Sequence, residues 1–176
     1  MIRTYSTYFR NLPTGASIAY TTIVLLFAAA LLLVNVLNVV TVYVTLHRHG
    51  DTLRFAESIL SGVCHRMPSR SFWIAEVPLG LCSRCTGIYG FAFIGLLVSA
   101  LPKFTLLQRS PKMALVLLLP MILDGLLEHF DLYSGNNPIR FTTGAAFGFC
   151  LVAFALDAGG QLIRSFHKQG GTNVTL

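Results

Sequence analysis

Long apolar runs, rather than alternating apolar and polar positions, dominate this chain. The longest run covers residues 17–46 and contains no charged side chain. Three shorter runs follow at about 81–101, 113–127 and 141–156, and Pro120 is expected to kink the helix formed by 113–127. Because an α-helix needs about 20 residues to cross the hydrocarbon core of a bilayer, the pattern predicts four transmembrane helices.

The connection between the first two runs contains a shorter helical pattern. Asp51 or Thr52 can cap a helix in DTLRFAESILSG, and Gly62 can end it. Its apolar residues recur at helical spacing, namely at Leu53, Ala56, Ile59, Leu60 and Val63. The fold class predicted is therefore all-α, an integral membrane bundle of four transmembrane helices plus a short interfacial helix.

These patterns divide the chain into five segments. They are an N-terminal tail (1–16), the first transmembrane helix (17–46), an extramembrane connection with the interfacial helix and a Cys-His motif (47–80), a three-helix membrane core (81–158) and a C-terminal tail (159–176).

Composition supports a membrane protein and excludes several other classes. Apolar residues make up 54% of the 176 residues and charged residues 11%, whereas soluble domains carry about 25% charged residues. Such a chain has too few charged residues to be a disordered or coiled-coil protein, whose surface must be solvated by water. Its net charge of +6 is too small and too scattered for a nucleic-acid partner. Membrane lipids are the expected partners, and the oligomeric state stays open.

An even number of membrane crossings places the connections 47–80 and 128–138 on the same side of the bilayer. That side carries six basic and six acidic residues, so its charges cancel. The opposite side holds both termini, seven basic residues and a single acidic residue, Asp157, and thus the whole net charge of +6. Because basic residues near the ends of spans favour the cytoplasm, we predict that both termini are cytoplasmic.

Three of the four cysteines fall on the charge-balanced side. Cys82 and Cys85 form a C-x-x-C pair, and Cys64 with the neighbouring His65 can complete a tetrahedral set for a metal such as zinc. Since adjacent residues seldom bind one ion together, the fourth ligand stays open between His65, water and another residue such as His129. A redox or disulfide pair has equal weight, because an oxidising extracytoplasmic face favours disulfides.

Acidic residues follow one another around the end of the third apolar run. Asp124, Glu128 and Asp131 form one stripe if that helix continues past residue 127. Asp124 lies at membrane depth, so it must face the bundle and have a partner, for which Arg140 is the natural candidate. One interpretation is a structural ion pair. The other makes Asp124 a ligand, a proton acceptor or a substrate contact.

Arginines supply the positive charge on the same side. Arg66, Arg70, Arg84 and Arg140 can hold a phosphate-like group or a lipid headgroup through their forked donors, or snorkel to headgroups without specificity. Arg84 is the strongest candidate, because it stands between two cysteines whose thiol pKa values its charge would lower.

Small residues in the second and fourth runs predict close helix packing. Gly87 and Gly90 follow the cysteine pair, and Gly144 and Gly148 recur at the same kind of spacing. We expect these glycines to let the two helices approach each other. Cys150, within the fourth run, is expected to be a small packing residue.

The motifs CHRMPSRSF, LCSRCTGIYGF, LPMILDGLLEHF and NNPIRFTTGAAFG, in this order, resemble a family of predicted bacterial and archaeal membrane proteins, the domain of unknown function 2085. The resemblance covers about 64–148 and implies a site without implying a reaction. It also implies a prokaryotic cell membrane, and it leaves Glu128 and His129 at variable places. The matching positions are Cys64, His65, Pro68, Arg70, Ser71, Phe72, Cys82, Arg84, Cys85, Thr86, Gly87, Ile88, Tyr89, Asp124, Gly125, Asn137, Arg140, Thr143 and Gly144.

Three hypotheses follow for the function. The leading one is a polar site at one membrane face that binds a metal through Cys64, His65, Cys82 and Cys85. Any reaction would be on a lipid or phosphate-like group, with Asp124, Arg84 and Arg140 as catalytic residues. The second is a thiol–disulfide or quinone-linked redox protein. The third is a non-catalytic stapled scaffold or a small transporter. Whether the protein is an enzyme stays open.

Overall fold

A computed structural model of the chain describes residues 14–47, 50–99, 111–130 and 132–170, and within these ranges the protein is mostly helical. Its elements are, in order, α2 (Thr14–Leu46), α3 (Gly50–Ser61), the short 3-10 helix η1 (Pro68–Arg70), β1 (Trp73–Ile74), β2 (Val77–Pro78), α4 (Ser83–Ser99), α6 (Pro111–His129) and α7 (Asn137–Gly170). The helical fold class is confirmed. Pro120 lies inside α6, and α7 continues beyond the predicted end of the fourth run.

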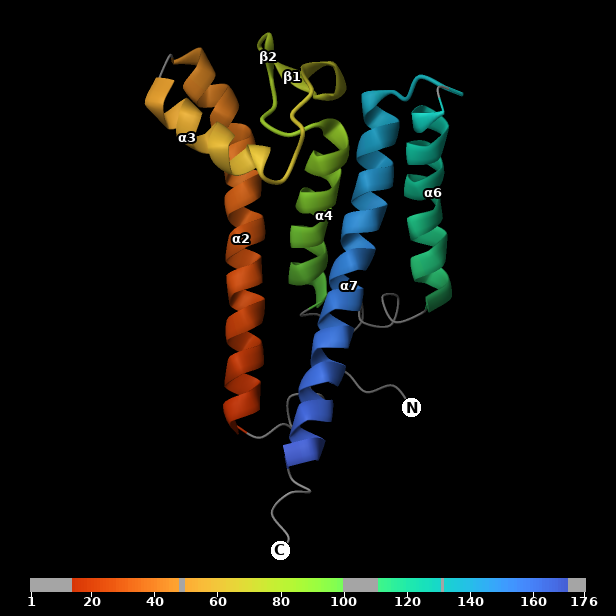
Figure 1. The fold of residues 1–176 in the computed structure, drawn as a ribbon. Coiled ribbons are helices and arrows are strands. Elements are labelled where there is room, and N and C mark those ends of the chain that lie inside the picture. Colours follow the sequence, from red (N-terminus) through yellow and green to blue (C-terminus); the bar gives the residue numbers. More distant parts are fainter. Residues whose placement is uncertain (1–13, 48–49, 100–110, 131, 171–176) are drawn as a thin grey trace, which may run out of the picture.

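The long helices stand side by side, with α4 between α2 and α7, and α6 on the other side of α7 (Figure 1). Glycines set the distance between α4 and α7. A Cβ atom at Gly87 would overlap the backbone of Phe141, and one at Gly148 would overlap the carbonyl of Ile88. Residue numbers rise together along this contact, so the two helices run parallel. The predicted close packing is confirmed for Gly87, Gly144 and Gly148, whereas Gly90 faces the side chain of Asn35.

Two side-chain amides attach α2 to α4 and to the segment just before it. Asn35 donates to the carbonyl of Tyr89 at 3.1 Å. Asn38, only 3% exposed, accepts a hydrogen bond from the backbone of Leu81 at 2.7 Å and donates to Thr86 at 3.3 Å. Amides of this kind hold helices together where the surroundings are apolar, because they would otherwise be unsatisfied.

The predicted interfacial helix exists as α3. It buries Ala56 and Leu60 and ends at Ser61, next to the expected terminator Gly62. Its first residue is Gly50, one residue before the expected cap Asp51.

A short hairpin, β1–β2, whose strands have two residues each, was not expected from the sequence. Its strands are antiparallel, and its turn residues Ala75 and Glu76 have φ of 46° and 63°. Glycine or asparagine normally occupies such a turn, and with Ala75 and Glu76 in these positions the usual signal of a hairpin is missing.

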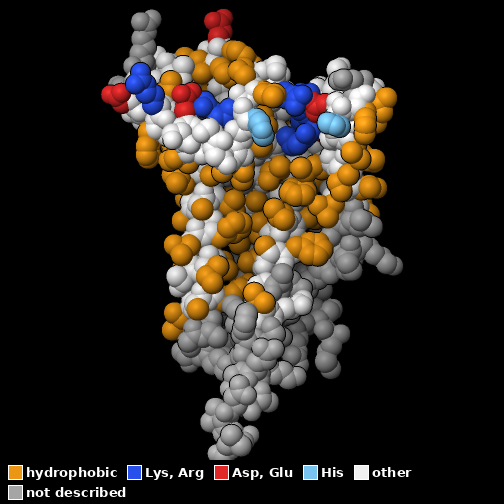
Figure 2. All heavy atoms as spheres, in the orientation of Figure 1, with side chains coloured by type: hydrophobic (Ala, Val, Ile, Leu, Met, Phe, Trp, Pro, Cys, Tyr) orange, Lys and Arg blue, Asp and Glu red, His pale blue; other side chains and the backbone are white. Residues whose placement is uncertain are grey.

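Polar side chains gather at the end of the bundle where α4 and α7 begin. Ser83 and Asn137, near the first residues of these helices, are joined by a hydrogen bond of 3.3 Å. Charged side chains lie at this end in Figure 2, above a body covered with apolar side chains. The cysteines and the arginines therefore share one end of the bundle, as the sequence predicted.

Two of the described helical stretches, Ile18–Leu46 and Asn137–Leu156, are long and apolar enough to cross a membrane. The Ser83–Ser99 helix is apolar but shorter, so the predicted count of four transmembrane helices is not confirmed. Large apolar side chains are exposed along α2, including Leu25 at 63% and Leu26 at 66%. An unpaired apolar surface of this kind is what contact with lipid requires.

Candidate metal centre and arginine network

Three cysteines from separate parts of the chain converge at the polar end of the bundle. Cys64 ends the turn after α3, where its backbone donates to the carbonyl of Leu60 at 2.9 Å. Cys82 immediately precedes α4 and Cys85 lies in its first turn. All three are free thiols, and their sulfur atoms lie within 4.8 Å of one another. A tetrahedral ion with bonds of about 2.3 Å to sulfur needs separations near 4 Å, so the arrangement is close to that of a metal centre.

The sulfur of Cys64 accepts hydrogen bonds that favour a thiolate. The backbone amides of Arg66 and Cys82 each donate to it, both at 3.4 Å. Hydrogen bonds from the thiols of Cys82 and Cys85, assisted by these two amides, lower the pKa of Cys64, while burial opposes them. The main causes for Cys64 are thus hydrogen bonds. The sequence prediction was a different one, that the charge of Arg84 would lower the pKa values of Cys82 and Cys85. Metals bind the thiolate form, so these bonds prepare a ligand.

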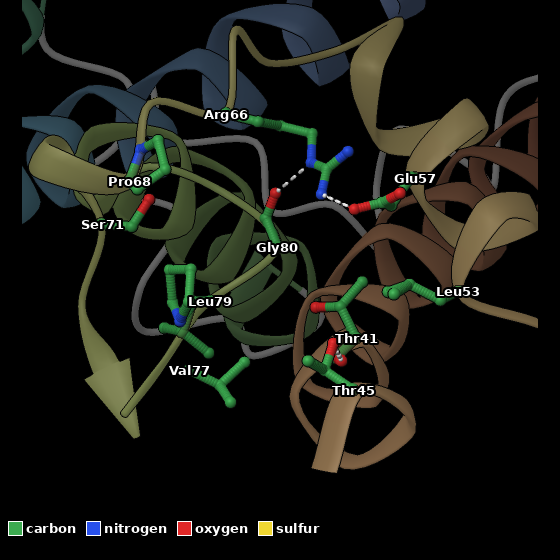
Figure 3. Close-up of a pocket in the computed structure, with 11 residues that line it drawn as sticks. Thr41, Thr45, Leu53, Glu57, Arg66, Pro68, Ser71, Val77, Leu79 and Gly80 are labelled. Atoms are coloured by element: carbon green, nitrogen blue, oxygen red, sulfur yellow. Dashed lines mark hydrogen bonds and ion pairs between the residues drawn. The ribbon is translucent and has the colours of Figure 1, made fainter. Parts of the chain in front are cut away.

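A left-handed residue turns the backbone toward that sulfur. Arg66 has φ of 53°, which costs energy for any residue with a Cβ atom. Its side chain is held on both sides, donating to the carbonyl of Gly80 at 3.1 Å and to Glu57 of α3 at 2.7 Å (Figure 3). These contacts connect α3, the turn after Cys64 and the segment before α4. They stabilise the conformation that aims the Arg66 amide at the sulfur.

The histidines predicted as further ligands do not join the three sulfurs. Among the described residues, the group with ligand atoms mutually within 4.8 Å contains Cys64, Cys82 and Cys85 alone. His65 is exposed, and His129 is exposed at the end of α6. The fourth ligand therefore stays unassigned. Cys150 is buried inside α7, as expected for a packing residue.

A second cluster lies where α4, α6 and α7 meet. Glu128 forms ion pairs with three arginines from three parts of the chain: Arg140 at 2.7 Å, Arg70 at 3.0 Å and Arg84 at 3.1 Å. Arg84 also pairs with Asp124, which is 5% exposed. We call Arg70, Arg84, Arg140, Asp124 and Glu128 the arginine network.

The predicted pair between Asp124 and Arg140 is wrong. Because α6 and α7 are antiparallel neighbours, the residue closer to the end of α6 lies opposite the start of α7. That residue is Glu128, and it takes Arg140. Asp124, one turn deeper, lies 3.5 Å from the hydroxyl of Thr143, one turn deeper in α7. The partner of Asp124 is instead Arg84.

Sequence reasoning missed several members of the site. It placed little weight on Glu128, which holds the arginines together, and it did not consider Tyr133, whose hydroxyl donates to Asp124. That hydrogen bond raises the pKa of Tyr133, because loss of its proton would set a second negative charge beside the carboxylate. Asp131, the third member of the predicted acidic stripe, lies outside the described residues. The spacing of four between Asp124 and Glu128 was the available clue.

The metal centre and the arginine network occupy different faces of α4. At 3.6 residues per turn, Arg84 lies about 100° from Cys85 around the helix, and Cys82 lies just before the helix begins. The cysteines pack with Leu37 of α2 and Leu60 of α3, whereas Arg84 binds α6. The single pocket expected from the sequence is therefore two neighbouring centres at one end of the bundle.

The chain matches known sequences but no solved structure. Residues 64–154 match the profile of a family described as "Predicted membrane protein (DUF2085)". An uncharacterized protein of Methanocaldococcus jannaschii is 34% identical over 108 residues, which cover 60% of this chain and 69% of the relative. An uncharacterized protein of Methanothermobacter thermautotrophicus is 36% identical over 89 residues, covering 51% and 80%. No solved structure is significantly similar.

Proposed function

Since the chain belongs to the DUF2085 family of predicted membrane proteins, we propose that it is a membrane protein that binds a thiophilic metal ion, with zinc as the candidate. Cys64, Cys82 and Cys85 would supply three thiolate ligands, and His65 or water the fourth. The observation that carries the proposal is the convergence of three sulfurs within 4.8 Å, with two backbone amides already directed at one of them. A disulfide needs two cysteines, whereas a metal centre makes use of all three.

Four membrane crossings and cytoplasmic termini are part of this proposal. Helix α4 has 17 residues and α6 has 19, which is within the range of about 17–25 residues found for transmembrane helices. The metal centre would then lie at the external surface. Cysteine substitutions in the connection 47–80 and in the C-terminal tail, probed with an impermeant maleimide on intact cells, test the orientation. Labelling of the connection alone is expected. Labelling of the tail alone would show the opposite orientation, with the termini outside.

Metal analysis of the full chain, purified in detergent without chelator, tests the central claim. We expect about one zinc per chain, lost on Cys85→Ser and retained in the control Cys150→Ser, since Cys150 lies away from the centre. The absence of stoichiometric metal after supplementation with zinc, copper or iron would refute the proposal. Equal metal content in the two variants would show that the ion lies elsewhere.

A redox protein is the second candidate, and one observation favours it. Cys82 and Cys85 are free thiols with the spacing of C-x-x-C oxidoreductases, and they stand at the start of α4. In this case the pair would form a disulfide and pass two electrons and two protons to a quinone. A thiol titration that loses two thiols on incubation with a water-soluble quinone, in metal-free protein, would favour this candidate.

A reaction on a lipid or phosphate-like group needs the ion and the arginines to reach one substrate. Arg84 and Arg140 bind carboxylates of α6, while the cysteines pack toward α2 and α3. We therefore propose metal binding as the function. Asp124, Arg84 and Arg140 are proposed as members of a separate anion-binding centre rather than as groups that share a substrate with the metal.

A further inference from the structure

Positive charge exceeds negative charge in the arginine network. Three guanidinium groups meet two carboxylates, so the five groups carry a net charge of +1. Asp124 is 5% exposed, and each of its oxygens has a partner: Oδ1 accepts the hydroxyl of Tyr133 and Oδ2 pairs with Arg84. Glu128 pairs with Arg70, Arg84 and Arg140, and Arg140 also donates to the amide oxygen of Asn137 at 3.3 Å. A single carboxylate offers two oxygens to three forked donors, which leaves donors in excess.

The excess can be seen in individual atoms. Nε of Arg84 is buried and has no acceptor among the residues that the structure describes. The side chain of Arg70 is 44% exposed and has one ion pair, to Glu128. Burying a cationic donor without an acceptor is costly, so a network that exists only to join helices would be expected to satisfy it. An additional anion would supply the missing acceptors.

The position of the network identifies the kind of anion. It lies at the end of the bundle where the charged side chains of Figure 2 give way to apolar surface. Below it, α6 exposes Ile122 at 51% and Leu126 at 48%, and Ile139 of α7 is 41% exposed. Arginine forks match the tetrahedral oxygens of phosphate, and a lipid lying on this apolar surface would bring its phosphate to their level.

We infer that Arg70, Arg84 and Arg140 form a binding site for a phosphate group, as carried by a membrane lipid headgroup. Glu128 is the internal counter-ion of this site, and an incoming phosphate takes over part of its contacts. Arg84 and the cysteines face different partners, α6 for Arg84 and α2 and α3 for the cysteines, so the site does not depend on the proposed metal. Failure of one proposal leaves the other intact.

Removal of the internal counter-ion is the first test. In Glu128→Gln the three arginines lose their shared charge partner, and the thermal midpoint of the detergent-solubilised chain should fall. Inorganic phosphate at millimolar concentration should restore the midpoint, while sodium chloride of equal ionic strength should not. Equal effects of the two salts would overturn the inference and leave a network that only joins helices.

Lipid retention is the second test, and it does not depend on the stability of Glu128→Gln. Wild type and Arg70→Ala are each incubated with phosphatidylglycerol or with an uncharged galactolipid and analysed by native mass spectrometry. The exposed Arg70 can be truncated with little risk to folding, and loss of one charge-assisted contact should lower phosphatidylglycerol affinity by about tenfold. Arg54→Ala is the matched control, because Arg54 is an exposed arginine of α3 at the same end.

The two probes also identify the source of the phosphate. Rescue by inorganic phosphate together with selective retention of phosphatidylglycerol supports a lipid headgroup. Rescue by inorganic phosphate without lipid retention keeps the arginine site but assigns it to a soluble phosphate. Retention of phosphatidylglycerol by Arg70→Ala at the wild-type level, or retention of the galactolipid equally well, would overturn the inference.

Discussion

Substitution of Arg66 tests whether the left-handed turn serves the metal centre. Its φ of 53° directs its backbone amide to the sulfur of Cys64 at 3.4 Å. Its side chain makes two further contacts, with Gly80 at 3.1 Å and with Glu57 at 2.7 Å. Glycine keeps the backbone N–H and adopts a positive φ without strain. Alanine keeps the N–H but is strained at a positive φ, and proline has no N–H and cannot adopt a positive φ. The three variants therefore separate backbone from side chain.

The expected stabilities follow from these contacts. Relief of left-handed strain in Arg66→Gly is worth about 1–2 kcal/mol. Against this, the ion pair with Glu57 joins side chains 26% and 39% exposed, so its loss costs at most about 1 kcal/mol. The hydrogen bond to Gly80 is worth about 1 kcal/mol, and the added freedom of glycine when unfolded costs about 0.5–1 kcal/mol. The net change in the free energy of unfolding therefore lies between a loss of about 2 kcal/mol and a gain of about 0.5 kcal/mol.

Alanine loses the same two contacts without relief of strain. Arg66→Ala should therefore lower the free energy of unfolding by about 1–2 kcal/mol, and it should be less stable than Arg66→Gly. This order reverses the usual one, in which alanine is the more stabilising residue. Denaturant unfolding of the chain in detergent micelles, followed by fluorescence of Trp73, measures the difference.

Zinc affinity gives the second readout. Arg66→Gly and Arg66→Ala keep the amide donor and should bind zinc close to wild type. Arg66→Pro has no N–H and a φ fixed near −65°, so it should weaken zinc binding by tenfold or more, given that second-shell contacts are worth about 10–100-fold. Competition with a chromophoric chelator measures the affinity. Wild-type affinity in Arg66→Pro, or greater stability of alanine than glycine, would refute the reasoning.

Three further predictions concern the bundle and the ion. A Cβ atom at Gly144 would overlap the carbonyl of Arg84, so Gly144→Ala should destabilise the chain by about 1–3 kcal/mol. A Cβ atom at Gly125 would meet no described atom within 4 Å, so Gly125→Ala should stabilise the chain by about 0.5–1 kcal/mol. Asn38→Ala leaves the buried amide of Leu81 without its acceptor and should cost about 1–3 kcal/mol. Thermal unfolding in micelles measures the stability of all three variants. Equal midpoints for Gly144→Ala and Gly125→Ala would contradict the packing argument. Chelation should lower the midpoint of wild type but not of Cys85→Ser, because only the former has a bound ion to lose.

The general arrangement was predictable because it depends on hydropathy and on the alternation of sides. The long apolar runs predicted helices, and the even number of crossings inferred from them predicted that Cys82 and Arg140 share one end, where the structure has them. The convergence of Cys64 on the C-x-x-C pair followed from residue type and spacing. To predict which residues share an end, only the direction of each helix is needed, and the order of the apolar segments in the sequence supplies that direction.

The pairing of charges was not predictable, because it depends on the rotation and the offset of each helix. Arg140 was assigned to Asp124, but an offset of one turn gives it Glu128 instead. The spacing of residues within a single helix does not determine that offset. It depends on how deeply α6 packs beside α7, where Asp124 lies opposite Thr143 and Glu128 lies opposite Arg140.

The first turn of α4 explains why one motif produced two centres. In the sequence, Arg84 stands between Cys82 and Cys85, and adjacency suggested that all three act together. A helix turns successive residues by about 100°, so neighbours in sequence face different partners. The carbonyl of Arg84 is fixed by the close approach of Gly144, which leaves its side chain directed to α6 and the sulfurs directed to α2 and α3. The motif therefore contributes Cys82 and Cys85 to the metal centre and Arg84 to the arginine network. A shift of the first turn of α4 would change the geometry of both sites.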